Sequence, residues 1–178
     1  MATAYAAGAE NLPFGVLRGY AGTDLAAHTP RLATITCPFT GEELAAVPAH
    51  RPDVGIVHAQ RADAAGNVQL WGITGVQKEV VLASARSLVT VEEIVDELET
   101  RPGAIVLPGW AIDAVAVAPG GAHPSYAHGY YDRDNAFYVR WDEIARDRDR
   151  FTAWVDRHVR GTRDVEEYHR SLGDAVVA

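Results

Sequence analysis

Two histidines in the C-terminal half of the chain are the first candidates for chemistry. His123 and His128 lie five residues apart, and Asp132 and Asp134 follow them closely. Imidazole and carboxylate groups are ordinary zinc ligands, so a metal site is one interpretation. The spacing is not that of a His-Glu-x-x-His helix, however, and residues 119–124 contain two glycines and two prolines, which disfavour a helix. These residues favour a tight loop in which His123 bonds the backbone, and no metal site is expected.

Two adjacent acids, Glu92 and Glu93, are the second candidate, because carboxylates can act as acids, bases or nucleophiles. They fall within or just after residues 87–95, whose β-branched side chains predict a strand. Burying a carboxylate is costly unless it is hydrogen-bonded or functional. The favoured interpretation is that one acid ends the strand and the other caps the next segment. A functional pair is the alternative.

A third group consists of neutral polar side chains near predicted strand ends and loops: Gln60, Gln69 and Gln77. Ligands of open α/β sheets bind at the carboxyl ends of the strands, so these residues are placed to contact one. The single cysteine, Cys37, ends an apolar run and is expected to be a buried, unreactive thiol. Neither a Walker loop nor a Gly-x-Ser-x-Gly elbow occurs in the sequence.

Alternating strands and helices are expected to position these residues. Apolar runs and turn residues predict strands at 16–18, 32–37, 44–49, 53–59, 68–71, 87–95, 104–107 and 114–118. Residues 76–85 contain no helix breaker and predict a helix. Helical spacing of aromatic residues over 132–160, with Asp147 capping a second helix and Thr162 capping a last one, predicts a helical region at 132–172. This order predicts an α/β fold with an open, largely parallel sheet and flanking helices.

Composition limits the function classes further. The 178 residues fit a single domain over 1–178, and 48% of them are hydrophobic, enough to form a core. A net charge of -8 argues against nucleic-acid and membrane partners, because both require a basic surface. No apolar stretch reaches the ~20 residues that span a bilayer, and the N-terminus does not resemble a signal peptide. One cysteine fits a reducing compartment, so a cytoplasmic location is expected.

Several stretches occur in an order typical of one enzyme family. They include Leu12-Pro13-Phe14, Gly22-Thr23-Asp24-Leu25, residues 37–49, 61–68 and 89–95, the Gly-Gly-Ala-His-Pro segment at 120–124, and 129–134. Together they cover nearly the whole chain. The sequence resembles the α subunit of family I coenzyme A transferases, closest to the glutaconate CoA-transferase type. The strand, Gly-rich loop and helix with which such a subunit begins have no counterpart here, so the chain is expected to lack the N-terminal portion.

This resemblance implies a fold shared with sugar-phosphate isomerases and a reaction of the EC 2.8.3 type. A coenzyme A thioester is the substrate, no cofactor is bound permanently, and CoA passes between carboxylic acids through a glutamyl-CoA thioester. The nucleophilic glutamate is expected on a partner β subunit, so neither acid of the Glu92–Glu93 pair is assigned that role. Two alternatives stay open, a CoA-ester hydrolase of the same family and a non-catalytic structural subunit.

Six residues are expected near the substrate cleft, because they lie in loops after predicted strands and within the matched stretches. They are Arg18, Gly22, Thr23, Gln60, Trp71 and Gln77. The catalytic residue itself is expected on the partner, and none is assigned in this chain.

Overall fold

A computed structural model describes residues 1–20 and 22–173. Within it, the chain forms two compact units. The first unit contains residues 1–57, 73–88 and 110–114, and the second contains 58–72, 89–109 and the chain from residue 115. Two long strands begin in the first unit and end in the second. The expectation of one family-type domain over 1–178 stays a prediction.

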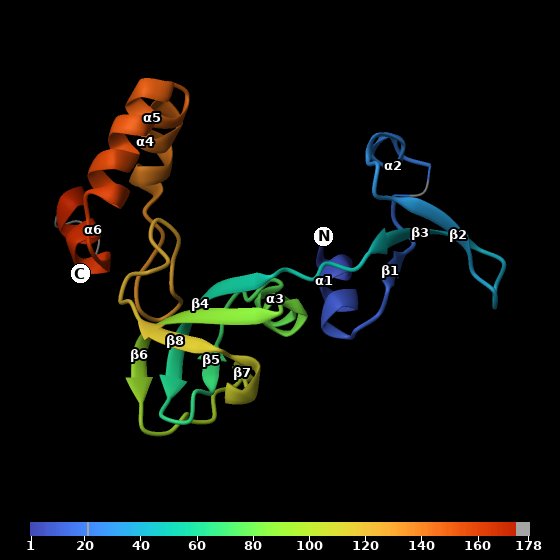
Figure 1. The fold of residues 1–178 in the computed structure, drawn as a ribbon, viewed down its shortest axis with the longest axis horizontal. Coiled ribbons are helices and arrows are strands. Elements are labelled where there is room, and N and C mark those ends of the chain that lie inside the picture. The colour runs from blue at the N-terminus through green and yellow to red at the C-terminus, as the bar shows by residue number, and fades with distance from the viewer. Residues whose placement is uncertain (21, 174–178) are drawn as a thin grey trace. The chain divides into compact units, whose positions relative to one another are not determined.

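The first unit contains a three-stranded antiparallel sheet and short helices (Figure 1). Its elements are α1 (Ala2–Ala9), β1 (Phe14–Leu17), α2 (Asp24–His28), β2 (Ala33–Thr36), β3 (Glu43–Pro48) and α3 (Gln77–Ala83). The strand order is β1-β3-β2. The predicted strands at 16–18, 32–37 and 44–49 and the helix at 76–85 are therefore confirmed with small shifts of their ends.

Helix α1 packs closely because small residues line its contacts. Ala4 and Ala7 are buried, and a Cβ on Gly8 would lie 1.9 Å from the His50 carbonyl oxygen. On β1, a Cβ on Gly15 would lie 2.7 Å from the Thr3 carbonyl oxygen. Glycine at these two positions therefore lets the backbones of helix and sheet approach each other. One face of the sheet thus rests on α1.

A second, five-stranded sheet has the order β7-β5-β4-β6-β8. Its strands are β4 (Val54–Asp63), β5 (Val68–Leu70), β6 (Arg86–Val95), β7 (Ile105–Leu107) and β8 (Ala114–Val117), and a short 3-10 turn spans Gly109–Ala111. Each of these strands falls at a predicted position. The buried core of the second unit includes Val68, Leu70, Val89, Val91 and Leu107, all at most 2% exposed.

The strand directions make this a mixed sheet, which corrects the expectation of a largely parallel one. Backbone hydrogen bonds join Ser87 to Asp113 and Val91 to Ala118, so β6 and β8 advance in parallel. The pairs β4–β5 and β5–β7 are antiparallel. The reversal follows from a tight turn after β4, where the Asp63 carboxylate accepts hydrogen bonds from the Ala65 and Asn67 amides.

The C-terminal part of the chain is helical, as expected for 132–172. It contains α4 (Asn135–Ala145), α5 (Arg148–Val155), a π-helical turn (Asp156–Arg160) and α6 (Val165–Leu172). Asp134, Asp147 and Asp164 accept hydrogen bonds from the first backbone amides of α4, α5 and α6. The last of these corrects the expected cap at Thr162, whose hydroxyl instead donates to the His158 carbonyl.

Aromatic side chains hold α4 and α5 together. Trp141 stacks on Phe137 at 5.7 Å between ring centroids and meets Trp154 edge-on at 4.9 Å. None of the helices in the described part of the chain is long and apolar enough to cross a membrane.

Candidate functional site

One group of interacting polar residues in the second unit surrounds Glu92. It comprises His58 from β4, Thr90 and Glu92 from β6, and Gly120 and Tyr131 from the segment after β8; we call it the Glu92 cluster. Residues 90 and 92 share a face because side chains alternate along a strand. The strand residues of the cluster lie in the middle of β4 and β6, and the loop after β8 covers them.

Both oxygens of Glu92 are occupied. The His58 Nε2 atom lies 2.5 Å and the donating Tyr131 hydroxyl 2.8 Å from Oε1, while the Gly120 amide donates to Oε2 at 2.8 Å. The Glu92 side chain is only 4% exposed. A carboxylate so enclosed does not present a free oxygen to a substrate. It ties the loop after β8 to the sheet instead, and the Ala122 amide strengthens this tie by donating to the Tyr131 hydroxyl at 2.9 Å.

Glu93 points to the other face of β6 and forms a separate group. Its Oε1 accepts hydrogen bonds from the Tyr130 hydroxyl at 2.6 Å and from Arg61 Nε at 2.7 Å. The Tyr130 hydrogen bond, with a smaller contribution from Arg61, lowers the pKa of Glu93. Both acids therefore lie inside β6 with partners of their own. The expectation that one of them caps the next segment was wrong.

Gln60 and Trp71, two of the six expected cleft residues, are brought together. The Gln60 side-chain amide donates to the Trp71 carbonyl at 3.2 Å and accepts from the Trp71 amide at 3.1 Å. The indole nitrogen donates to the His128 carbonyl at 2.8 Å, and the Arg101 guanidinium lies 4.3 Å from the indole centroid. Both residues are buried. Their polar groups are used in holding β4 to the residue that follows β5.

A polar pocket of about 370 Å³ lies beside these groups in the second unit. Arg61, Gln69, Glu99 and Arg101 contribute to its lining. Gln69 donates to the Glu99 carbonyl at 2.8 Å, so Gln69 is fixed as well.

The other four expected cleft residues belong to the first unit. Arg18 directly follows β1 and lies 3.1 Å from the Glu42 carboxylate. Gly22 has a φ of +74°, and Thr23 caps α2 by accepting a hydrogen bond from the Ala26 amide. Gln77 is the first residue of α3. The six residues thus divide between the two units, and their role in a substrate cleft stays a prediction.

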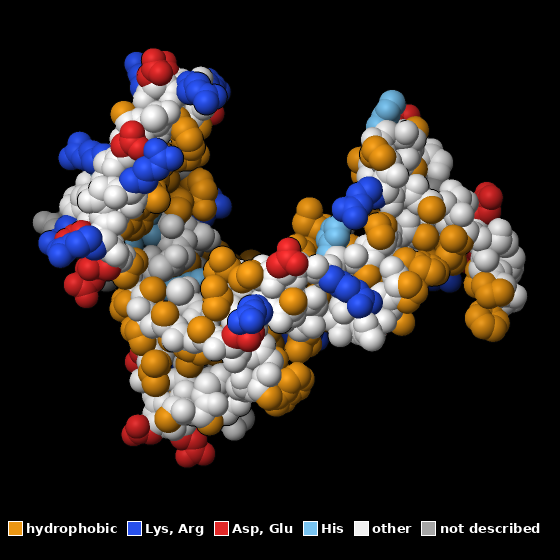
Figure 2. Space-filling view, viewed as in Figure 1, with side chains coloured by type: hydrophobic (Ala, Val, Ile, Leu, Met, Phe, Trp, Pro, Cys, Tyr) orange, Lys and Arg blue, Asp and Glu red, His pale blue; other side chains and the backbone are white. Residues whose placement is uncertain are grey.

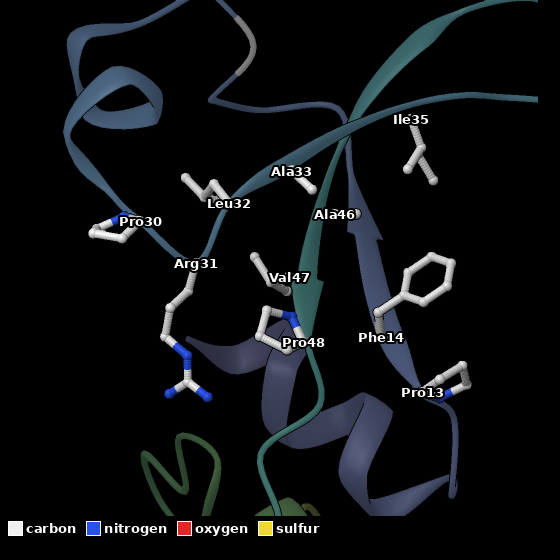
Figure 3. Close-up of a pocket in the computed structure, with 10 residues that line it drawn as sticks. All are labelled: Pro13, Phe14, Pro30, Arg31, Leu32, Ala33, Ile35, Ala46, Val47 and Pro48. Atoms are coloured by element: carbon white, nitrogen blue, oxygen red, sulfur yellow. The ribbon is translucent and has the colours of Figure 1, made fainter.

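A hollow of about 400 Å³ in the first unit was missed by sequence reasoning. Figure 3 shows the residues that line it. Apolar residues of β1, β2 and β3 and of the segments just before β1 and β2 form it, and Arg31 is the only charged residue among the described residues that line it. We call it the Arg31 groove. The signal that would have found it is the alternation of side chains along three short strands, once their pairing is known.

His123 is fixed by side chains, which corrects the expected bond to the backbone. Its Nδ1 lies 3.0 Å from the Tyr168 hydroxyl and its Nε2 lies 3.4 Å from the Asp134 carboxylate. Within the described residues, no group of three or more histidine, cysteine or acidic side chains is arranged to hold a metal ion. Cys37 is half-buried rather than fully buried, and a hydrogen bond with Thr40 lowers the pKa of its thiol.

Comparisons with known proteins identify relatives along most of the chain. A family model described as Coenzyme A transferase matches residues 1–118. The chain is 59% identical over 174 residues to the A-type subunit of 3-oxoadipate CoA-transferase from Pseudomonas knackmussii, covering 98% of this chain and 62% of that protein. It is 39% identical over 139 residues to the A-type subunit of glutaconate CoA-transferase from Acidaminococcus fermentans, covering 76% of this chain and 43% of that protein.

A solved structure of a relative has a similar fold. The structure of glutaconate coenzyme A-transferase from Acidaminococcus fermentans matches with a TM-score of 0.87 and 32% identity. The match covers 99% of this chain and 61% of that chain. The expected α/β fold is therefore confirmed, and the sequence spans less than two thirds of the length of these relatives.

Proposed function

The chain belongs to the coenzyme A transferase family, and we propose that it forms the A-type subunit of an enzyme that moves CoA between carboxylic acids. The observation that carries the proposal is the 59% identity to the A-type subunit of 3-oxoadipate CoA-transferase over 98% of this chain. A small dicarboxylic acid, such as 3-oxoadipate or glutaconate, is the proposed substrate class. A partner subunit of B type completes the proposed enzyme, and a cytoplasmic location stays a prediction.

The proposed reaction proceeds by covalent catalysis. A glutamate carboxylate attacks the carbonyl carbon of an acyl-CoA thioester, the C–S bond breaks, and an acyl-glutamyl anhydride forms as CoA leaves as a thiolate. The thiolate then attacks the glutamyl carbonyl, which releases the first acid and leaves a glutamyl-CoA thioester. A second carboxylate collects CoA by the reverse steps, so the enzyme is regenerated unchanged.

The state of the paired acids supports a nucleophile on the partner subunit. A nucleophilic carboxylate must meet the thioester carbonyl with a free oxygen. The support comes from Glu92, which is enclosed and bonded at both oxygens, while Glu93 is held through Oε1 by Arg61 and Tyr130. Both acids join β6 to its neighbour β4 and to the segment after β8. The proposed contribution of the chain is to shape the acyl side of the cleft, with Arg18, Gly22 and Thr23 as candidates.

Co-expression with a B-type partner tests the proposal. The purified complex is incubated with an acyl-CoA donor and 3-oxoadipate or glutaconate, and new acyl-CoA is measured by liquid chromatography and mass spectrometry. We expect the complex to exchange CoA between the acids. Neither of its two proteins should do so in isolation. Release of free CoA without exchange would identify a CoA-ester hydrolase instead, and a complex without turnover would leave only a structural role.

A further inference from the structure

The outer face of the first unit's sheet is apolar. Gly15 faces α1, so its neighbours Phe14 and Val16 point to the opposite side of β1. The register pairs these two residues with Pro48 and Ala46 of β3. Phe14 and Val16 are 42% and 43% exposed, which is unusual for large apolar side chains in adjacent positions of one face. Figure 2 shows hydrophobic side chains exposed over this part of the molecule.

Small side chains hollow this face into the Arg31 groove. Ala33 of β2 pairs with Ala46 of β3, and these two methyl groups form the floor. Phe14 and Ile35 stand on either side of it, on the same side of the sheet (Figure 3). The hollow of about 400 Å³ falls within the range of small-molecule pockets, roughly 300–1,000 Å³. An apolar chain would therefore fit between the aromatic and aliphatic walls.

One positive charge lies at the edge of this apolar surface. Arg31 is exposed, and its side chain extends along the end of β3 that carries Pro48 (Figure 3). Across residues 1–20 and 22–173, Arg31 has neither an ion pair nor a side-chain hydrogen bond, in contrast to Arg18, which pairs with Glu42. A guanidinium group offers two parallel N–H donors that match a carboxylate. Apolar walls with one unpaired guanidinium are complementary to a hydrocarbon chain that ends in a carboxylate.

We propose that the Arg31 groove binds the acyl chain of a dicarboxylic substrate, with Arg31 holding the carboxylate that does not carry CoA. This inference rests on the proposed function, since it assigns the far end of that substrate. It makes Arg31 a specificity residue, which distinguishes a diacid from a monoacid of equal length.

Equilibrium binding tests the inference separately from turnover. Adipate and hexanoate have the same chain length and differ in the second carboxylate. Calorimetric titration of the complex with its B-type partner is expected to give tighter binding of adipate, and Arg31→Met is expected to weaken adipate binding ~10- to 100-fold while hexanoate binding stays unchanged. Arg31→Lys should retain part of the preference, because the charge is kept and the paired geometry is lost.

Two further variants sharpen the test. Ala33→Leu fills the groove floor and is expected to weaken both acids, whereas Arg148→Met, at an exposed arginine of α5, is expected to weaken neither. Equal binding of adipate and hexanoate, or an Arg31→Met complex that keeps the preference, would overturn the inference. Protection of residues 33–36 and 43–48 from hydrogen exchange by the B-type partner without any acid present would also overturn it, because the groove would then be a protein interface.

The failure of the inference is distinguishable from that of the proposed function. Arg31-dependent binding of adipate without CoA exchange would leave the groove assignment in place and refute the transferase. Exchange that proceeds with diacids in Arg31→Met at an unchanged KM would refute the groove assignment and leave the transferase in place.

Discussion

Replacing Tyr131 with phenylalanine tests the role of the Glu92 cluster most sharply. The Tyr131 hydroxyl donates to Glu92 Oε1 at 2.8 Å and accepts from the Ala122 amide at 2.9 Å. Burial, the largest cause, and the Glu92 carboxylate raise the pKa of this phenol, so the hydroxyl keeps its proton at neutral pH. The variant removes one oxygen atom and leaves the ring in place, so both hydrogen bonds are lost with little change in packing.

The magnitude follows from these two contacts. A hydrogen bond to an ionised group contributes about 1.5–3 kcal/mol, and a backbone amide left without a partner costs about 1–3 kcal/mol. Because the site is part-buried, water replaces some of the loss, and we expect a decrease in the free energy of unfolding of about 2–4 kcal/mol. With a urea m-value of about 2 kcal/mol/M, the midpoint should fall by about 1–2 M.

Urea unfolding followed by tryptophan fluorescence measures this change, since Trp71, Trp141 and Trp154 all lie in the second unit. Tyr138→Phe is the matched control, because Tyr138 is 42% exposed and its ring, which the variant keeps, carries the contact with Arg133. Faster hydrogen exchange at the Ala122 amide is expected in Tyr131→Phe alone. A midpoint shift no larger than that of Tyr138→Phe would refute the assignment of the cluster as an anchor.

Three further predictions concern glycine geometry and pH. Gly120→Ala places a Cβ 2.5 Å from His169 Nε2 at a φ of +73°, whereas Gly103→Ala has a φ of +75° and open space around it. Thermal denaturation should therefore show a larger loss of stability for Gly120→Ala than for Gly103→Ala, which should cost only about 1 kcal/mol. Equal losses would contradict the packing of α6 against this loop. The lowered pKa of Glu93 means that its contribution to stability is complete above about pH 4.3 and is lost as the pH falls through its folded pKa. In Glu93→Gln the melting temperature should therefore depend less on pH in that acidic range. An unchanged pH dependence of the melting temperature would contradict the pair with Tyr130. Burial lowers the pKa of His169, whose ring nitrogens lack hydrogen-bond partners among the described residues. The unfolded chain therefore binds more protons than the folded chain below about pH 6.5, and the free energy of unfolding should decrease there. A pKa of His169 above 6.5 in an NMR titration would contradict this.

The sequence predicted the strands better than the helices of the first unit. Apolar and β-branched residues, at 53–59 and 87–95, marked most of β4 and β6 in spite of the polar residues within them. Helix α1 carried no such signal. Its residues are largely alanine and glycine, so its contacts with β1 and α3 depend on close backbone approach and not on an apolar stripe. Helix α2 is a single short turn whose cap, Thr23, was singled out only as a cleft residue.

The candidate site was harder to predict, because its contacts join distant segments. The Glu92–Glu93 pair was recognised from its place in a buried strand, but its partners come from β4 and from the loop after β8. No local pattern links Tyr130 and Tyr131 to those acids. The Arg31 groove depends on the register of three strands, and a shift of one residue would turn every apolar side chain to the other face.

The position of the covalent intermediate tests the central proposal most directly. The complex of this chain with its B-type partner is incubated with an acyl-CoA, treated with hydroxylamine, and digested for peptide mass spectrometry. The central proposal is supported if one glutamate of the partner subunit is converted to a hydroxamate and every glutamate of this chain stays unmodified. A hydroxamate at Glu92, Glu93 or another acid of this chain would contradict it.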